Sequence, residues 1–280
     1  MKNNITIGFI GQGFVGKNYA DDFEERGYNI VRYDIESYKE NKDKIKGCDI
    51  TLIAVPTPTT KKGFDCSIIN DVLNLIGDNN IAIIKSTIKI GTTKELQSKH
   101  PNIIIMHSPE FLVERTAAHN ARNPKRNIIG ITNPNDNELY KKAELVMSTL
   151  PKADYNLITK VENAEIIKYG GNCLLYTRVV FINMFHDLIL KYPELDFKTI
   201  TSAMAADPRI GGTHLSVSHQ GGRGAGGHCF IKDFEAFIEM FEENNLNSQK
   251  GTCEAIRNIN LKYLKESNKD LDLIRGVYGE

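Results

Sequence analysis

Short runs of apolar residues recur along the first half of the chain, with mixed apolar and polar segments between them. The runs are rich in Ile and Val and nearly continuous in hydrophobicity, and they cover residues 5–10, 29–33, 49–55, 81–85, 103–107 and 128–132. Strands that are covered on both faces have this continuous pattern, whereas half-exposed strands alternate. Helical segments between such strands indicate an α/β fold with a doubly wound parallel sheet of the Rossmann type.

Apolar positions in the second half recur at helical spacing instead. A long helix is expected over 161–191, where the apolar positions are Ala164, Ile167, Leu174, Leu175, Ile182, Phe185 and Ile189. Further helices are expected around 230–241 and 250–266, with a Gly-rich and Pro-containing loop over 207–227. Pro151 ends a helical segment and places a boundary near 150–160. We therefore expect an α/β domain over 1–156 and an all-α domain over 157–280.

Length and charge agree with two domains and exclude several classes of function. At ~100–200 residues per domain, a chain of 280 residues predicts two. Lys and Arg number 35, as do Asp and Glu, which argues against a nucleic-acid binder that relies on a basic surface. No apolar stretch approaches the ~18–20 residues of a membrane helix, and the first ten residues do not resemble a signal peptide. We expect a soluble, cytoplasmic protein that binds neither nucleic acid nor membranes.

The cysteines do not form a pattern that predicts disulfides or a metal site. The chain has five, without a C-x-x-C pair: Cys48, Cys66, Cys173, Cys229 and Cys253. Neither disulfides nor a zinc site is supported by this odd and scattered set, and no metal site is expected.

A glycine-rich turn follows the first apolar run and precedes a helical segment. Gly11, Gly13 and Gly16 form the G-x-G-x-x-G pattern, and Asp34 ends the second apolar run. In dinucleotide-binding folds these glycines permit a tight turn, approach of the pyrophosphate and close helix packing, while the helix N-terminus supplies amide donors. An acid at Asp34 accepts hydrogen bonds from the adenosine ribose and repels a 2′-phosphate, which favours NAD over NADP. FAD shares the pattern, and a purely structural turn is the other alternative.

A second glycine-rich segment precedes a Cys and an amphipathic helix. Five glycines between 221 and 227 lead to Cys229, and Asp233 follows one helical turn later. A Cys at a helix N-terminus is exposed and has a lowered thiol pKa. Many cysteines are merely small buried hydrophobes. A loop crowded with Gly is a poor place to bury one and favours the approach of a ligand, so we expect Cys229 to be functional.

Three polar residues share one face of the long helix expected over 161–191. Glu165, Lys168 and Asn172 lie at helical spacing, and two consecutive glycines interrupt the helix between the last two. Each Gly costs roughly 1 kcal/mol relative to Ala in mid-helix. Close approach of a ligand or of another helix would explain the glycines, whereas a solvated helix face is the alternative.

Further motifs occur in a fixed order along the chain. They are Val55-Pro56-Thr57-Pro58, Lys85-Ser86-Thr87, Gly91-Thr92, Ser108-Pro109-Glu110-Phe111-Leu112, Lys168-x-x-x-Asn172, Asp207-Pro208-Arg209-Ile210-Gly211 and Gly226-Gly227-His228-Cys229. With the turn at 11–16, this ordered set closely resembles the UDP-glucose/GDP-mannose dehydrogenase family from residue 5 to about 240. A Cys preceded by Gly-Gly-His resembles the branch acting on UDP-N-acetyl-mannosamine-type sugars, whereas Asp233 after Lys232 resembles the UDP-glucose branch.

The resemblance implies an NAD-dependent nucleotide-sugar 6-dehydrogenase of polysaccharide biosynthesis. Such an enzyme oxidises a sugar C6 alcohol to a uronate in two steps, through a Cys thiohemiacetal and thioester, on a UDP-glucose-like or UDP-N-acetylhexosamine-like substrate. It also implies that the helical domain serves dimerisation and substrate binding, that the long helix forms a homodimer interface, and that Arg209 reaches the substrate in the neighbouring subunit.

The resemblance also assigns residues by position. The implied catalytic residues are Cys229 as nucleophile, Lys168 and Asn172 at the oxyanions, Thr87 and Asp233 at water and proton transfer, and Glu110 in thioester hydrolysis. The implied cofactor-binding residues are Gly11, Gly13, Phe14, Val15, Gly16, Asp34, Val55, Pro56, Thr57, Thr87 and Glu114. The implied substrate-binding residues are Phe111, Leu112, Lys168, Asn172, Arg209, Gly226 and Gly227.

The sequence departs from the family pattern in several places. Arg115 stands where the family usually has Gly, the glycines at 170 and 171 replace small helix formers, and the loop from Arg209 to Cys229 is a few residues longer. The family continues into a second Rossmann-like domain that closes over the nucleotide, whereas this sequence stops at Glu280. We therefore expect a shortened substrate site, weak substrate binding, and possible completion of the site by a separate protein.

Two other functions fit part of the pattern. A β-hydroxyacid dehydrogenase shares the Rossmann-plus-helices plan and a Lys-x-x-x-Asn pair, but it transfers a single hydride and needs no thiolate. A catalytically dead NAD-binding protein that works by association is the other alternative. The intact set of polar residues implied by the resemblance argues against such decay.

Overall fold

The computed structural model describes residues 5–60 and 63–279, and its chain divides into two compact units. The first unit comprises residues 1–58 and 65–168, and the second comprises 59–64 and 169–280. The division falls inside one long helix, α6 (Val161–Ile189), later in the chain than the boundary expected after residue 156.

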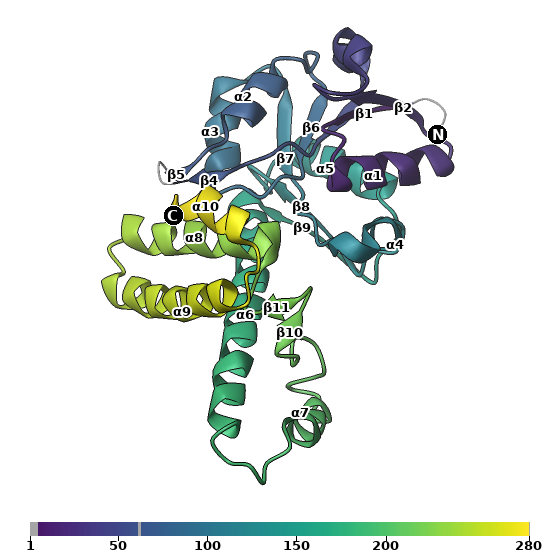
Figure 1. Ribbon diagram of the computed structural model, residues 1–280. Helices are drawn as coiled ribbons and strands as arrows, with labels where there is room; N and C mark the ends of the chain where they lie inside the picture. Colours follow the sequence, from purple (N-terminus) through teal and green to yellow (C-terminus); the bar gives the residue numbers. More distant parts are fainter. Residues whose placement is uncertain (1–4, 61–62, 280) are drawn as a thin grey trace. The chain divides into compact units, whose positions relative to one another are not determined.

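The first unit is built on a seven-stranded sheet (Figure 1). Its strands lie in the spatial order β2 (Asn29–Tyr33), β1 (Thr6–Ile10), β3 (Ile50–Ile53), β6 (Ile81–Ile84), β7 (Ile104–His107), β8 (Arg126–Ile131) and β9 (Tyr155–Lys160). The six continuous apolar runs of the sequence correspond to six of these strands. Strands β3 and β6, for example, are buried at every position, as continuous runs predict. The doubly wound, mostly parallel fold is confirmed.

One strand pair reverses the parallel pattern. The first five strands are parallel, β8 pairs with β7 in the antiparallel sense through His107 and Gly130, and β8 and β9 are again parallel. Strand β9 was not expected, because its residues are exposed or only half-buried and do not form a continuous apolar run. It forms an edge of the sheet, where hydrophobicity is a weak signal.

Helices cover both faces of this sheet. They are α1 (Phe14–Glu25), η2 (Lys39–Gly47), α2 (Ser67–Leu73), α3 (Thr92–Lys99), η3 (Glu114–Thr116), α4 (Ala117–Arg122) and α5 (Asn137–Thr149). Helix α1 lies on one face, and α2 and α3 lie on the other (Figure 1). Right-handed crossovers in opposite directions from β1 require this arrangement. The carboxyl ends of β1 and β3 therefore open next to the start of α1, where ligands bind in such sheets.

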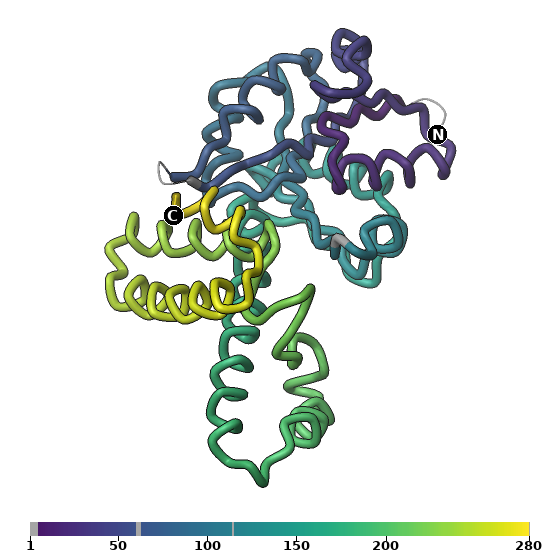
Figure 2. Tube along the Cα trace, viewed as in Figure 1, coloured from purple at the N-terminus to yellow at the C-terminus, as the bar shows by residue number. Residues whose placement is uncertain are grey.

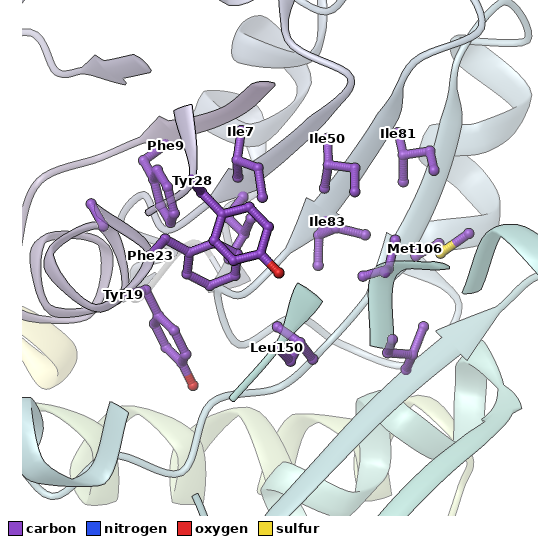
Figure 3. Close-up of a cluster of buried hydrophobic side chains, with 14 of the residues drawn as sticks. Ile7, Phe9, Tyr19, Phe23, Tyr28, Ile50, Ile81, Ile83, Met106 and Leu150 are labelled. Atoms are coloured by element: carbon purple, nitrogen blue, oxygen red, sulfur yellow. The ribbon is translucent and has the colours of Figure 1, made fainter. Parts of the chain in front are cut away.

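A hydrophobic core lies between α1 and the sheet (Figure 3). The ring of Phe23 on α1 meets Phe9 of β1 edge-on at 5.4 Å and lies 5.2 Å from Tyr28. Phe9 and Phe23 are fully buried. This packing holds the C-terminal part of α1 against β1.

The second unit is mainly helical. It contains most of α6, from residue 169 onward, and also α7 (Phe197–Ala205), α8 (Gly227–Glu243), α9 (Asn247–Glu266) and α10 (Leu271–Tyr278). It also contains two short hairpins, formed by β4 (Thr59–Thr60) with β5 (Gly63–Phe64) and by β10 (Ser218–His219) with β11 (Gly222–Arg223). These hairpins were not expected, since each strand has only two residues and too little length to show periodicity.

Aromatic side chains fill the centre of this second unit. Tyr176 of α6 stacks on Phe234 of α8 with ring centroids 3.9 Å apart, and both are almost fully buried. Helices α8 and α9 pack side by side (Figure 2). Within the described ranges, none of the helices is both long and apolar enough to cross a membrane.

Candidate active site

The turn at 11–13 has the backbone geometry of a dinucleotide-binding site. Gly11 adopts φ +88°, and a Cβ there would lie 2.4 Å from the carbonyl oxygen of Ala54. A Cβ at Gly16 would lie 1.9 Å from the carbonyl oxygen of Gly11, so α1 packs on the turn only through glycine. At Gly13, by contrast, a Cβ meets nothing within 4 Å. Two glycines thus serve the turn itself, and the third leaves open space beside the backbone.

The start of α1 offers donors to an anion. Gly13 is the N-cap and makes no side-chain capping hydrogen bond, and the helix continues with Phe14 and Val15. No acidic residue occupies its first turn. The first N–H groups of a helix need acceptors, and the helix dipole favours a negative one, so this end suits a pyrophosphate.

The carboxylate of Asp34 is fixed beside the same turn. Its Oδ2 accepts a hydrogen bond from the N–H of Gln12 at 2.7 Å, and its Oδ1 accepts one from Glu36 at 2.9 Å. Each carboxylate oxygen retains a second lone pair, which can accept a ribose hydroxyl. The turn, the open space at Gly13 and the placed acid together fit a nicotinamide dinucleotide.

Two loops at the carboxyl ends of β3 and β6 are tied together. The hydroxyl of Thr57 donates to the carbonyl of Thr87 at 2.8 Å, and Ser86 donates to the carbonyl of Val55 at 2.6 Å. Thr57 and Thr87 are buried, whereas Pro56 is exposed. These bonds bring the predicted cofactor residues of the two loops together in one unit.

A buried ion pair joins α6 to the loop after β7. The Nζ of Lys168 donates to Glu110 Oε1 at 2.8 Å and to the carbonyl of Glu110, also at 2.8 Å. Both side chains are at most 7% exposed. The other carboxylate oxygen of Glu110 accepts the N–H of Leu112 at 2.6 Å. Two residues predicted as catalytic are therefore in direct contact, although 58 positions separate them in the chain.

A second lysine lies in the same region, and sequence reasoning gave it no role. Lys85 is buried at the end of β6, where its Nζ donates to the hydroxyl of Ser108 at 3.1 Å and lies 4.6 Å from the ring centre of Tyr19. Burial lowers the pKa of its ammonium to about 8, against the opposing attraction of Glu110. A Lys at the end of a fully apolar run is the signal that identifies such a group in the sequence.

Other predicted residues of this loop have different surroundings. Phe111 carries the guanidinium of Arg126 over its ring at 3.7 Å, and the Nζ of Lys168 lies 5.7 Å from the same ring. Leu112 is half-buried. Glu114 begins η3, but its side chain lies outside the part of the chain that the structure describes.

Glu165 is buried and holds the start of α3. Its carboxylate accepts the N–H of Gly91 at 2.7 Å, and the N–H and hydroxyl of Thr93 at 2.9 and 2.7 Å. The exposed fraction of Glu165 is 0%, so it does not belong to a solvated helix face. These hydrogen bonds anchor the loop that follows Thr87 to α6.

In the second unit, Cys229 lies in the first turn of α8, as expected from the glycines before it. The helix begins at Gly227, with Gly226 as N-cap, so Cys229 is its third residue. The Cys is neither fully buried nor fully exposed. By contrast, Cys48 and Cys173 are buried, and burial raises the pKa of both thiols.

One helical turn beyond Cys229, a buried carboxylate is held by two partners. Asp233 is 1% exposed, and its Oδ2 accepts the side-chain amide of Asn172 at 2.6 Å. The Nζ of Lys232 donates to its Oδ1 at 2.8 Å. Asn172 and Asp233, both predicted as catalytic, are therefore paired within the second unit.

The remaining predicted residues lie on a loop and at the start of α8 in the second unit. Arg209 has 88% of its side chain exposed and pairs with Asp207, with Nη2 2.6 Å from Oδ2. Arg178 fixes this loop by donating to the carbonyls of Ile210 and Gly211 at 2.8 Å. Gly227 adopts φ +82°, and a Cβ there would meet nothing within 4 Å.

Comparison with known families accounts for both parts of the chain. Residues 37–145 match the NAD binding domain of the UDP-glucose/GDP-mannose dehydrogenase family, and residues 162–262 match its central domain. Together these matches cover most of the sequence. The prediction of NAD as cofactor is confirmed by the first of them.

Individual relatives agree with the family matches. The chain is 31% identical to protein MJ1054 of Methanocaldococcus jannaschii over 95% of this chain and 35% of that one. It is 30% identical to the putative UDP-glucose 6-dehydrogenase YtcA of Bacillus subtilis, over 79% of this chain and 52% of that one. The chain thus spans between about a third and about half of the length of these two relatives.

A solved structure has the same fold. The UDP-glucose dehydrogenase of Pyrobaculum islandicum superposes with a TM-score of 0.78 at 24% identity, covering 93% of this chain and 69% of that one. This likeness supports the Rossmann-type sheet and the helical region that follows it.

Proposed function

The chain belongs to the UDP-glucose/GDP-mannose dehydrogenase family, and we propose that it is an NAD-dependent nucleotide-sugar 6-dehydrogenase. The reaction is the oxidation of a sugar C6 alcohol to a carboxylate in two steps. We propose a UDP sugar as substrate, with a glucose-like or an N-acetylhexosamine-like ring, because relatives such as YtcA are named for UDP-glucose.

The observation that carries this proposal is the position of Cys229. It lies in the first turn of α8, one helical turn before the buried carboxylate of Asp233. The dipole of a helix N-terminus stabilises a thiolate, and a thiolate is the nucleophile that captures an aldehyde. A dehydrogenase that stops after one hydride transfer has no use for this group.

The chemistry of the chain's own groups follows from this assignment. NAD, when bound, accepts one hydride in each of the two oxidations. The C6 hydroxyl loses its proton and a hydride to give the aldehyde, and the thiolate of Cys229 adds to the aldehyde carbon to form a thiohemiacetal. Loss of a second hydride and a proton leaves a thioester, and water then cleaves the C–S bond to release the carboxylate and the thiol.

Lys168 and Asn172 stabilise the negative oxygen that forms at C6 in this proposal. Lys168 offers a buried ammonium, and Asn172 offers amide donors whose orientation is set by Asp233. Thr87 and Asp233 position water and assist proton transfer. Glu110, paired with Lys168 at 2.8 Å, serves as the base in the cleavage of the thioester.

The cofactor binds at the turn of the first unit in this scheme. The amides of Phe14 and Val15 at the start of α1 face the pyrophosphate, and Asp34 accepts the adenosine ribose hydroxyls. Val55, Pro56 and Thr57 form the next loop, and Glu114 is assigned to the nicotinamide by its position in the family motif.

We also propose that the chain forms a homodimer through α6. Exposed apolar side chains follow one another along this helix, with exposed fractions of 71% for Leu174, 54% for Phe181 and 56% for Leu188. An apolar stripe on a helix is typical of a surface that is covered by another helix. Arg209 on its exposed loop would then serve the site of the neighbouring subunit.

The stoichiometry of NADH formation tests the function. Limiting amounts of UDP-glucose, UDP-N-acetylmannosamine and other nucleotide sugars are incubated with excess NAD, and absorbance of NADH is followed to completion. Two NADH per sugar, with a uronate as product, are expected. One NADH per molecule of a simple 3-hydroxy acid, and none with any nucleotide sugar, would instead identify a β-hydroxyacid dehydrogenase.

A further inference from the structure

The glycine-rich loop before α8 packs against a later segment of the chain, residues 260–270. Three glycines at alternate positions make this contact: Gly222, Gly224 and Gly226. A Cβ at Gly224 would lie 2.9 Å from Asn260 Oδ1, and one at Gly226 would lie 1.9 Å from Asp270 Oδ2. Glycine at these positions therefore leaves room for side chains of the later segment, which a Cβ would displace.

Hydrogen bonds from the same segment hold the backbone of the loop. Asn260 accepts the N–H of Ala225 at 2.7 Å and donates to its carbonyl at 2.8 Å. Lys269 is buried, and its Nζ donates to the carbonyl of Gly224 at 3.0 Å. The loop has few side chains of its own, so residues 260–270 supply the contacts that order it.

Asp270 makes the last of these contacts, where the loop becomes helix. Its Oδ2 accepts the N–H of Gly227, the first residue of α8, at 2.7 Å. A carboxylate is a strong acceptor and complements the positive end of a helix. Asp270 has φ +55°, a conformation that Asp and Asn tolerate better than most residues, and its carbonyl accepts the N–H of Ile274. It therefore joins the start of α10 to the start of α8 (Figure 1).

We propose that Asp270 is a positioning residue for Cys229, which rests on the proposed role of Cys229 as nucleophile. Cys229 is the third residue of α8, so the direction of its thiol follows the backbone of the first turn. If the N–H of Gly227 loses its acceptor, that turn frays, since Gly226 and Gly227 impose little backbone restraint. Misplacement of a reacting group by about 1 Å can reduce a rate about 100-fold.

Three variants separate the hydrogen bond from backbone strain and from charge. Asp270→Gly removes the acceptor while accepting φ +55° freely. Asp270→Asn keeps an acceptor and also tolerates this conformation. Asp272→Ala is the matched control, because Asp272 is an acid in the first turn of α10 with 96% of its side chain exposed.

The first measurement is steady-state oxidation of the nucleotide sugar. We expect Asp270→Gly to lower kcat at least about tenfold with an unchanged KM for NAD, Asp270→Asn to stay within about threefold of wild type, and Asp272→Ala to match it. Recovery by Asn is a result that a general loss of stability would not produce. Wild-type kcat in Asp270→Gly, or an Asn variant as slow as the Gly variant, overturns the proposal.

The second measurement needs no activity. Hydrogen exchange of the Gly227 amide is expected to accelerate at least about tenfold in Asp270→Gly and to stay unchanged in Asp272→Ala. If wild type oxidises no nucleotide sugar, the proposed function fails, while unchanged exchange in Asp270→Gly refutes the positioning role by itself. Should Asp270→Gly not fold, Gly226→Ala tests the same contact from the other side, because its Cβ displaces the Asp270 carboxylate and should accelerate the same exchange.

Discussion

The ammonium of Lys168 lies 2.8 Å from the carboxylate of Glu110, and each side chain is almost fully buried. Burial removes both charges from water, so each depends on the other for compensation. The pair joins α6 to the loop after β7, and both residues have proposed roles in the chemistry at C6. Its removal should therefore affect stability as well as activity.

Replacing Lys168 by Met should lower the free energy of unfolding by about 3–5 kcal/mol, because the Glu110 carboxylate is then buried without a partner. The double variant Lys168→Met with Glu110→Gln should recover most of this loss. Chemical denaturation measures both. Lys94→Met is the control, since half of the Lys94 side chain is exposed to water and its pair with Glu162 should contribute at most about 1 kcal/mol. Equal losses in Lys168→Met and Lys94→Met would contradict the buried pair.

Lys85 should make stability depend on pH above neutrality. Burial lowers the pKa of its ammonium to about 8, whereas the unfolded chain keeps the ordinary value near 10.5. Between these values the unfolded state holds more protons, so the contribution of Lys85 to stability rises with pH. Lys85→Met should be more stable than wild type at pH 7, by an amount on the order of a few kcal/mol, and this advantage should shrink toward pH 10. A difference in the free energy of unfolding between the two proteins that stays constant from pH 7 to 10 would contradict this prediction.

Asp34 should determine the choice of cofactor. Asp34→Ala is expected to weaken NAD binding roughly tenfold or more, because charge-assisted hydrogen bonds to the ribose hydroxyls are lost, and to reduce discrimination against NADP. Fluorescence titration with each cofactor measures the effect. Glu36→Ala is the control, as an exposed acid two residues away whose loss should change neither affinity. Unaltered NAD affinity in Asp34→Ala would disprove the assignment.

Cys229 should be required for the acid product and dispensable for NAD binding. Cys229→Ala is expected to abolish formation of the uronate, because the aldehyde carbon then has no thiolate to capture it. Cys229→Ser should stall as an ester, since an alkoxide leaves less readily than a thiolate. Mass spectrometry of substrate-treated wild type should find the adduct on Cys229 alone. Cys253→Ser, at another half-buried Cys, is the control, and full turnover by Cys229→Ala would refute the thioester route.

The exposed stripe on α6 should carry the dimer. Leu174→Glu is expected to convert a dimer into a monomer, because a charge within an apolar interface is left without a partner. Light scattering after gel filtration gives the mass of each variant. Leu145→Glu, at an exposed Leu of α5, is the control and should remain dimeric. A wild type that is already monomeric would show that α6 is not a dimer interface.

The order of the strands and helices, and the local backbone setting of two predicted sites, can largely be predicted from the sequence. Continuous apolar runs predict the buried strands because a strand that is covered on both faces has no solvent-facing side, so its residues are apolar at every position. The turn at 11–16 follows from backbone sterics that only glycine satisfies. Cys229 is placed at a helix start because a glycine-rich loop precedes an amphipathic run, and its position in the first turn of α8 bears this out.

Contacts between distant segments were decided only by the tertiary structure. The pairs of Glu110 with Lys168 and of Asn172 with Asp233 join residues about 60 positions apart, and nothing local in the chain specifies them. Strand β9 carries no continuous apolar run, because an edge strand needs only one neighbour. In the sequence, the glycines at 222, 224 and 226 suggest that a ligand approaches the backbone. In the structure, side chains of residues 260–270 lie beside each of them. A glycine in the sequence predicts only that some group packs closely against the backbone, and the tertiary structure determines which group it is.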